Sequence, residues 1–308
     1  MAFRLLWNSK GWDSGNVDPL LMAEDPLEPF RRTFEALGYS FDTIFREDFA
    51  GQRAIRQASL GCEDEFRRRI VDSIARRGRP VIAIGVAGPP ECCLVTGYDG
   101  DGDTLIGWSY FQDMPEFAAG LRFEPAGYFR KRDWYANTFG LMSIGERSSR
   151  PSTSDLVRES LSWALKLVRT PMVRDHYSGL AAYASWAETL SMDGEFPIHD
   201  SALLHQRFMV HNDAVSTVAE GRWYAAQYLR RVAAQESSMA EQLLAAAACY
   251  EKEHDLMWEL WEAVGGNGVS EDRVLRLADP EVRRGMVSII LLASELDEEA
   301  AGQIERAL

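Results

Sequence analysis

The strongest constraint on the fold of this sequence is an apolar stripe near its C-terminal end. Apolar or aromatic side chains recur every three or four positions along the segment, and two glycines follow the last of them. This spacing places the side chains on one face of a helix, and glycine is typical of a helix end. A helix with such a face needs neighbours that cover it. The stripe consists of Leu243, Ala247, Tyr250, His254, Met257, Trp261 and Val264, and Gly265 and Gly266 follow it.

Two further helices with similar faces are predicted in the same part of the chain. Asp279 and Pro280 form a helix start, with a capping residue followed by proline, and Ser152 with Asp155 forms a capping box. The first of these helices carries Val282, Met286, Ile289, Ala293, Leu296 and Ala300, and the second carries Val157, Leu161, Ala164, Leu165 and Val168. Narrow apolar faces of this kind pack as neighbours in a helical bundle, which we therefore predict for residues 149–308.

The first half of the chain alternates short strands with helices. We expect strands over residues 3–7, 39–45, 79–86, 92–98 and 104–111, because these runs are apolar or alternate with period two. Helices are expected after Asp25-Pro26 and around Phe66, Ile70 and Ile74. The polar stretch 146–154, ERSSRPSTS, separates the two patterns. The predicted class is α+β, with an antiparallel sheet in a domain of residues 1–148 and an all-α domain of residues 149–308.

Charge and composition exclude several classes of protein. The chain has 33 basic and 47 acidic residues and a net charge of -14, so it repels phosphate backbones and anionic lipids, and no nucleic-acid or membrane partner is expected. No apolar run approaches the roughly 20 residues of a membrane-spanning helix. The N-terminus lacks a secretory signal pattern, so a cytoplasmic location with reduced thiols is expected. Arginines over residues 67–79 alternate with acidic residues, which favours a solvated helix face.

No metal or cofactor site is predicted. The DGDGD sequence at residues 99–103 lacks the glycine and the distal glutamate of a calcium loop, since Thr104 and Tyr110 occupy those positions, and it favours a hairpin turn. His199, His205 and His211 are six residues apart, and on a helix that spacing turns successive side chains by about 240°. They therefore do not converge on one ion.

Two adjacent cysteines at the start of a predicted buried strand, Cys92 and Cys93, are the candidate nucleophiles. Cysteine also behaves as a small hydrophobic residue, so both could simply be part of the core. The candidate bases are His176, which follows Asp175, and His254, which lies in the apolar stripe. A histidine within an apolar stripe is more often a core residue than a base, and both interpretations stay open.

Aromatic side chains supply the candidate binding residues. Trp7, Trp12 and Trp108 fall at strand ends or in loops, where ligand pockets are commonly built. A second set has helical spacing, and aromatic residues so spaced usually fill a core, although some of these could line a groove between the domains. That set consists of Tyr183, Trp186, Trp223, Tyr224 and Tyr228.

The segment 78–111 resembles the central strands of papain-like enzymes of the bacteriocin-processing C39 peptidase type and of the butirosin biosynthesis H family. Residues 179–190 and 221–263 are similar to the helical half of the butirosin H group. The resemblance implies a papain-like first domain, with a nucleophilic cysteine on an early helix, a histidine at the start of the strand before the GYD turn, and an acidic residue on the next strand. Its members are peptidases or acyltransferase-like proteins.

This sequence departs from that pattern at all three catalytic positions. The early helix has no nucleophile, because no cysteine precedes Cys62. Either Cys92 or Cys93 stands at the position of the histidine. On the next strand, Gly107-Trp108-Ser109 takes the place of the acidic residue. A thiol with an ordinary pKa near 8.5 replaces neither a base nor an activated nucleophile. The chain is therefore predicted to be a pseudoenzyme that binds a small molecule or peptide, with Glu91, Cys92, Trp108 and Tyr110 in its cleft.

Two other functions stay open. Cys92 or Cys93 could act with His176 or His254 in a thiol acyltransferase, an amide hydrolase or a related cysteine peptidase. A homo-oligomeric assembly factor, with exposed aromatic residues as interface anchors, is the third possibility.

Overall fold

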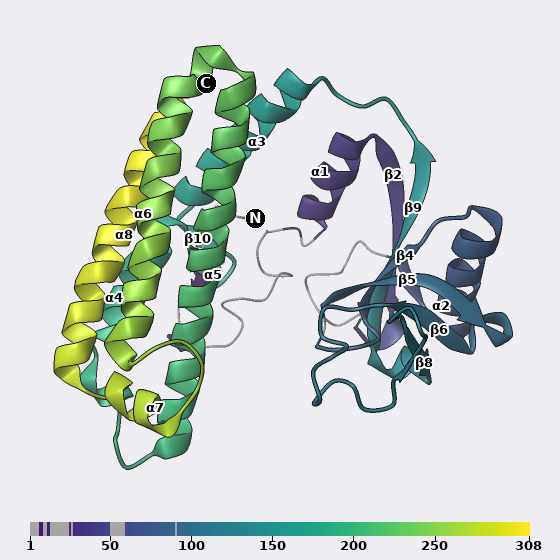
Figure 1. Ribbon diagram of the computed structural model, residues 1–308, viewed down its shortest axis with the longest axis horizontal. Helices are drawn as coiled ribbons and strands as arrows, with labels where there is room; N and C mark the ends of the chain where they lie inside the picture. The colour runs from purple at the N-terminus through teal and green to yellow at the C-terminus, as the bar shows by residue number, and fades with distance from the viewer. Residues whose placement is uncertain (1–5, 9–10, 13–24, 26, 50–58, 90) are drawn as a thin grey trace. The chain divides into compact units, whose positions relative to one another are not determined.

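The computed structural model describes residues 6–8, 11–12, 25, 27–49, 59–89 and 91–308 (Figure 1). The chain divides into two compact units. Residues 30–151 form the first, here called the sheet unit, and residues 1–29 and 152–308 form the second, here called the helical unit. Each has its own hydrophobic core.

The sheet unit contains an eight-stranded mixed sheet. Its strands follow the order β3-β2-β9-β4-β5-β6-β8-β7, and β2 with β3 is the one parallel pair among the described residues. The predicted α+β class with a largely antiparallel sheet is confirmed. The strands are β2 (Tyr39–Arg46), β3 (Ser59–Gly61), β4 (Val81–Gly85), β5 (Cys92–Asp99), β6 (Thr104–Trp108), β7 (Arg122–Phe123), β8 (Phe129–Arg132) and β9 (Thr138–Arg147).

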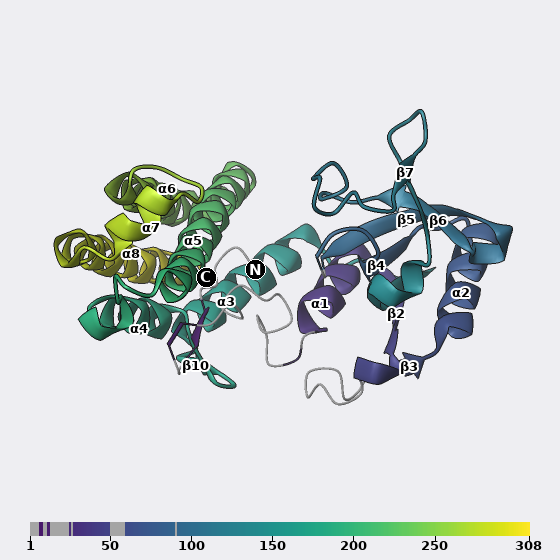
Figure 2. The same cartoon turned by 90° about the horizontal axis from the view of Figure 1, so that it is seen from below.

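One helix packs on each face of this sheet. On one face α2 (Glu63–Val71), continued by a π-helical turn over Asp72–Arg76, packs Phe66 and Ile70 into the core. On the other, α1 (Glu28–Leu37) stacks Phe34 on Phe41 of β2, with ring centroids 4.7 Å apart. Figures 1 and 2 both show α1 and α2 on opposite sides of the sheet. The mixed charges of α2 pair with one another, as in Arg67 with Glu63 at 2.8 Å, in agreement with a solvated face.

Six helices make up most of the helical unit. Four of them, α5, α6, α8 and α4, lie side by side, and Figure 2 views these helices nearly end on. The predicted cap at Ser152 is confirmed, because Ser152 Oγ accepts a hydrogen bond from the Asp155 N–H at 3.1 Å at the start of the helix over residues 153–169. The helices are α3 (Thr153–Arg169), α4 (Leu180–Leu190), α5 (Ser201–Gln235), α6 (Ala240–Val264), α7 (Glu271–Leu277) and α8 (Pro280–Ala307). Across the described residues, no helix combines the length and the apolar composition needed to cross a membrane.

The N-terminal segment groups with the helical unit and not with the sheet unit. The strand β1 (Leu6–Asn8) pairs antiparallel with β11 (His176–Ser178), which also pairs with β10 (Met172–Val173). The domain predicted over residues 1–148 includes this segment, whereas the compact units place it with residues 152–308. The physical reason is burial: Trp7 is fully buried in the core of the helical unit.

The predicted apolar stripes of α6 and α8 face the cores, but part of the α6 stripe is exposed to solvent and the buried face of α8 also contains charged residues. Most α6 stripe residues are buried, but His254 and Trp261 lie at its edge and are partly exposed. On α8 the buried face also contains two charged residues, Arg283 and Asp297, next to the predicted apolar positions. Arg283 donates hydrogen bonds to the Leu190 and Ala278 carbonyl oxygens, and Asp297 Oδ2 accepts one from Arg222.

Candidate functional site

The candidate site lies on the face of the sheet that carries α1, where the sheet opens to solvent. Direct cross-strand partners share a face, and Met142 opposes Ile82, which opposes Leu94 on its other side. Leu94 in turn opposes Trp108. Along this row Met142 is buried, Ile82 is half-buried, Leu94 is 38% exposed and Trp108 is 50% exposed. An apolar surface therefore comes to solvent at β5 and β6.

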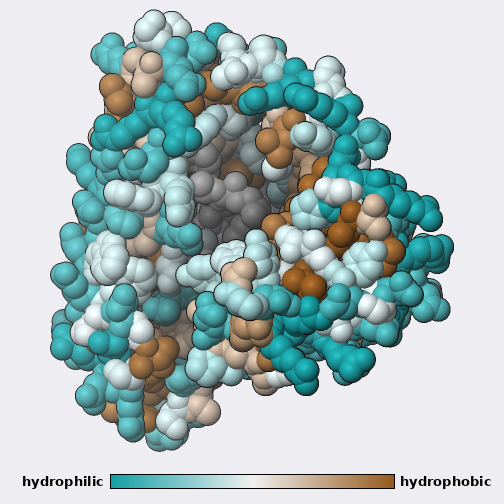
Figure 3. Space-filling model, turned by 45° about the vertical axis from the view of Figure 1, so that its right-hand side comes forward, coloured by the Kyte–Doolittle hydropathy of each residue, from teal (hydrophilic) through white to brown (hydrophobic). Residues whose placement is uncertain are grey.

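We call this surface the β5–β6 patch. It consists of Glu91, Cys92, Leu94, Trp108 and Tyr110, all of them exposed. Four of these residues, Glu91, Cys92, Trp108 and Tyr110, are the ones that the sequence analysis placed in a cleft, and the structure shows that all four are exposed. Figure 3 shows hydrophobic side chains at the surface of the sheet unit among hydrophilic ones.

The residues after β6 are fixed by buried hydrogen bonds. Ser109 Oγ donates to the Ala87 carbonyl at 2.7 Å, and the Ser109 N–H donates to Gln112 Oε1 at 3.1 Å. Gln112 Nε2 donates to the Gly127 carbonyl at 2.8 Å. These bonds hold the backbone between Trp108 and Tyr110, so both exposed aromatic side chains project from a rigid support.

Strained backbone at the end of β4 supports the other side of the patch. Val86 is buried and has a φ of 67°, which a β-branched residue adopts at a cost of about 1–3 kcal/mol. Before it, Gly85 has a φ of 95°, and a Cβ there would lie 2.0 Å from the Asn137 carbonyl oxygen. The Gly85 N–H donates to the Glu91 carbonyl at 2.9 Å. This hydrogen bond holds the backbone of Glu91, the residue before Cys92, against the end of β4.

The two adjacent cysteines point to opposite faces of the sheet. Cys92 is exposed on the patch, whereas Cys93 is 3% exposed and packs in the core of the sheet unit. Burial raises the pKa of Cys93 to about 12, with a further contribution from Cys92. Burial of its sulfur, followed by the charge of Glu91, raises the pKa of Cys92 as well. Both are therefore thiols and not thiolates near neutral pH, which is unfavourable for nucleophilic attack.

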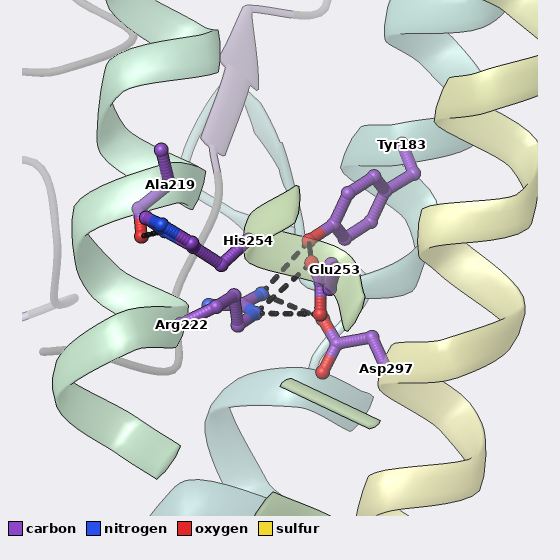
Figure 4. Close-up of polar contacts among 6 residues, drawn as sticks. All are labelled: Tyr183, Ala219, Arg222, Glu253, His254 and Asp297. Carbon is purple, nitrogen blue, oxygen red and sulfur yellow. Dashed lines mark hydrogen bonds and ion pairs between the residues drawn. The ribbon is translucent and has the colours of Figure 1, made fainter. Parts of the chain in front are cut away.

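The candidate bases belong to the helical unit. All five histidines of the chain follow residue 175, so the sheet unit has none. His176 lies on β11 with Nδ1 3.0 Å from Asp175 Oδ1. His254 uses both ring nitrogens. Nδ1 lies 2.8 Å from the Ala219 carbonyl oxygen (Figure 4), and Nε2 accepts a hydrogen bond from Trp258 Nε1 at 3.1 Å. A neutral His254 donates from Nδ1, and its only basic nitrogen is occupied.

Trp7 and Trp12, which the sequence analysis assigned to the ligand site, lie in the core of the helical unit. Their rings contact each other at 5.2 Å, Trp7 stacks on Trp186 at 5.8 Å, and Trp12 contacts Phe196 at 5.4 Å. The pairing of β1 with β11 makes Trp7 part of the helical unit, whereas Trp108 belongs to the sheet unit. Within the described part of the chain, no group of three or more possible metal-ligating residues occurs.

A buried ionic cluster in the helical unit escaped the sequence analysis. We call it the Arg222 cluster; it joins Arg222 of α5, Glu253 of α6, Asp297 of α8 and Tyr183 of α4 (Figure 4). Arg222 Nε lies 3.1 Å from both Glu253 oxygens, and Nη2 donates to Asp297 Oδ2 at 2.6 Å and to the Tyr183 hydroxyl at 2.9 Å. Tyr183 donates to Glu253.

Burial governs the protonation of the Arg222 cluster. The side chains of Arg222, Glu253 and Asp297 are 0% exposed. Burial raises the pKa of Glu253 to about 8, with a further contribution from the charge of Asp297. Burial also raises the pKa of Asp297, and the Arg222 guanidinium opposes both shifts. The pair therefore retains a proton near neutral pH. The Arg222 cluster joins four helices, and because it is closed to solvent it does not contact a substrate. The signal for it in the sequence is the position of Glu253 and Asp297 beside apolar stripe residues.

No family model matches the sequence, and no curated protein matches it.

Proposed function

We propose that the sheet unit is a degenerate papain-like domain that binds a small molecule or peptide at the β5–β6 patch without forming a covalent bond to it. The observation that carries this proposal is the pair of exposed aromatic side chains, Trp108 and Tyr110, on a backbone locked by Ser109. Rigid aromatic residues provide binding area at low entropic cost. Their exposure is unfavourable unless a ligand covers them.

The composition of the patch defines the class of ligand. Trp108 and Leu94 offer apolar contact, and the Glu91 carboxylate beside them favours a cationic or hydroxylated group. The ligand class is therefore a compound or peptide that carries an aromatic or aliphatic part next to an amine or hydroxyl group.

Binding is favoured over acyl transfer or amide hydrolysis by the state of the thiols. A catalytic cysteine has a lowered pKa and a base that accepts its proton. Cys92 and Cys93 have raised pKa values instead, and His254 has no unoccupied nitrogen.

Alkylation of the folded chain tests whether any thiol is activated. With iodoacetamide at pH 6.5 and peptide mass spectrometry, Cys92 is expected to react no faster than glutathione, because its pKa is raised. Cys93 and Cys249 are buried and are expected to react only after denaturation. Reaction of Cys92 or Cys93 at more than ten times the glutathione rate would support the enzyme and contradict the binding protein.

The binding surface itself is tested with aromatic amines. In saturation-transfer NMR, tryptamine and phenethylamine are expected to contact the protein, and indole-3-acetate is expected to bind more weakly because Glu91 repels its carboxylate. Trp108→Ala should weaken amine binding at least about tenfold, since aromatic anchors are the usual hot spots. The matched control is Phe123→Ala, which removes an aromatic residue of the same unit that is 46% exposed. Equal affinity in both variants would rule out the patch.

A further inference from the structure

A row of aromatic rings lies on the surface between α5 and α6 of the helical unit. We call it the aromatic seam; it consists of Trp223 of α5 and of His254, Trp258 and Trp261 of α6. Successive ring centroids are 5.2 Å, 6.3 Å and 4.9 Å apart, so the four rings form one continuous row.

Hydrogen bonds fix the α6 part of the seam. Trp258 Nε1 donates to His254, whose other nitrogen bonds the Ala219 carbonyl oxygen, and Trp261 Nε1 donates to Asn212 Oδ1 at 2.9 Å. The polar edges of these two indoles are thus satisfied within the protein. What they offer to a partner is ring surface in a fixed geometry.

The seam is exposed although its rings are large. Trp223 is 45% exposed and Trp258 is 46% exposed, and Tyr224 beside Trp223 is 59% exposed. Helical spacing favoured a core position for these aromatic residues, but Trp223 and Tyr224 are exposed, because the core face of α5 carries Arg222, Ala225 and Ala226 at this level. Large aromatic residues held half-exposed in a row are typical of interaction surfaces.

Acidic residues border the seam on both helices. On a helix, side chains three or four residues apart are neighbours. Glu220 precedes Trp223 by three residues, Asp255 precedes Trp258 by three, and Glu262 follows Trp258 by four. All three carboxylates are exposed, and none of them forms an ion pair with any described residue. The border therefore carries three exposed carboxylates outside any ion pair, and Lys252, three residues before Asp255, is the one basic residue at helical spacing from them.

The distribution of charge over the chain selects a basic partner. The chain has 33 basic and 47 acidic residues, and the sheet unit holds 17 of each. The helical unit therefore holds 16 basic and 30 acidic residues and accounts for the whole net charge of -14. A second copy of the helical unit would meet this surface with the same sign of charge, and anionic lipids would be repelled as well. A basic polypeptide is complementary in both charge and stacking, because guanidinium groups pack on indole faces.

We propose that the aromatic seam is a docking site for a basic segment of a partner protein, with arginine side chains stacked on Trp223 and Trp258 and paired with the bordering carboxylates. This site is separate from the β5–β6 patch, and it does not depend on the function proposed for that patch. It assigns the helical unit a role in protein–protein interaction.

Fluorescence anisotropy with the full chain tests the site. The probe is a fluorescein-labelled twelve-residue peptide of alternating arginine and leucine, compared with its glutamate–leucine counterpart. We expect the arginine peptide to bind, the glutamate peptide not to bind, and the affinity to fall with added salt. Trp223→Ala should weaken binding at least about tenfold, and the double variant Asp255→Asn/Glu262→Gln should act similarly, because both remove interface anchors.

Matched controls separate the seam from nonspecific attraction to an acidic protein. Glu271→Gln/Asp272→Asn removes two exposed acidic residues on α7, and Tyr177→Ala removes a side chain on β11 that is 36% exposed. Both are expected to retain the affinity of the native chain, with unchanged circular dichroism in every variant. Equal loss in the seam and control variants, or no binding of the arginine peptide, would overturn the proposal. Trp223→Phe, which keeps a ring, is expected to retain most of the affinity.

Discussion

The variant Arg222→Met is expected to unfold the helical unit, or to leave it on the edge of unfolding. Arg222 is the cation that faces Glu253 and Asp297, and all three side chains are fully buried. Removing one partner of a buried ion pair leaves an uncompensated charge and costs about 3–5 kcal/mol. A domain has about 5–15 kcal/mol of stability in total, so this loss is a large fraction of it.

Urea denaturation followed by far-UV circular dichroism measures the effect. The matched control is Arg230→Met on the same helix, because Arg230 pairs with Glu251 at the surface, where its side chain is 44% exposed. Surface pairs contribute about 0–1 kcal/mol, so this control should shift the unfolding free energy little. A smaller loss for Arg222→Met than for Arg230→Met would refute the role of the buried cluster.

A second variant separates the effect of charge from the effect of packing. In Arg222→Met/Glu253→Leu/Asp297→Leu, the three charges are replaced together by apolar side chains of similar size. Buried ionic groups replaced in this way are often neutral or stabilising. The triple variant is therefore expected to recover most of the stability that Arg222→Met loses. Failure to recover would indicate that Arg222 acts through its packing on Tyr250, over whose ring its guanidinium lies at 5.5 Å.

Local patterns predicted the elements of this fold but not their partners. The stripe of α6 and the capping residue of α3 follow from helical spacing within one segment. The Arg222 cluster could not be found in this way, because each charge is stabilised by a side chain on another helix. For the same reason, no local pattern indicated that β1 pairs with β11 and carries Trp7 into the helical unit.

In the candidate site too, local patterns predicted the strands, whereas the exposure of individual side chains depends on neighbours from other elements. Alternation and the Asp-Gly turn predicted the β5–β6 hairpin, and period two places Cys92 and Cys93 on opposite faces. Exposure of Trp223 and burial of Trp12 depend on which neighbours cover each ring, which helical spacing or loop position does not determine. The papain-like topology and its binding function remain proposals for experiment.

The stability of the helical unit is expected to fall as pH rises from about 6.5 to 8. Burial raises the folded-state pKa of Glu253 from 4.5 to about 8, so between these values the folded chain binds more protons than the unfolded chain. Stability from such a group is fully present below pH 4.5 and is lost as pH rises through the folded pKa. The slope is at most about 1.4 kcal/mol per pH unit for one proton.

His211 has the opposite effect on the acidic side. Burial lowers its pKa from 6.5 to about 3, and Nδ1 accepts a hydrogen bond from Trp186 Nε1 at 3.2 Å. Between pH 3 and 6.5 the unfolded chain therefore binds more protons than the folded chain, and stability is lost as pH falls below 6.5. From pH 4.5 to 6.5 the effects of Glu253 and His211 oppose each other, so the stability curve should be nearly flat there.

Single substitutions assign the alkaline side of this curve to one carboxyl group. Glu253→Gln mimics the protonated carboxyl group and should remove the loss of stability between pH 6.5 and 8, measured by urea denaturation at half-unit steps. The control Glu251→Gln should not, because the pKa of Glu251 is lowered by Arg230 and this residue is already ionised throughout that range. If Glu253→Gln keeps the alkaline decline of the native chain, the retained proton does not reside on Glu253. A decline absent from Asp297→Asn instead would place the proton on Asp297, the other carboxyl group that faces Arg222.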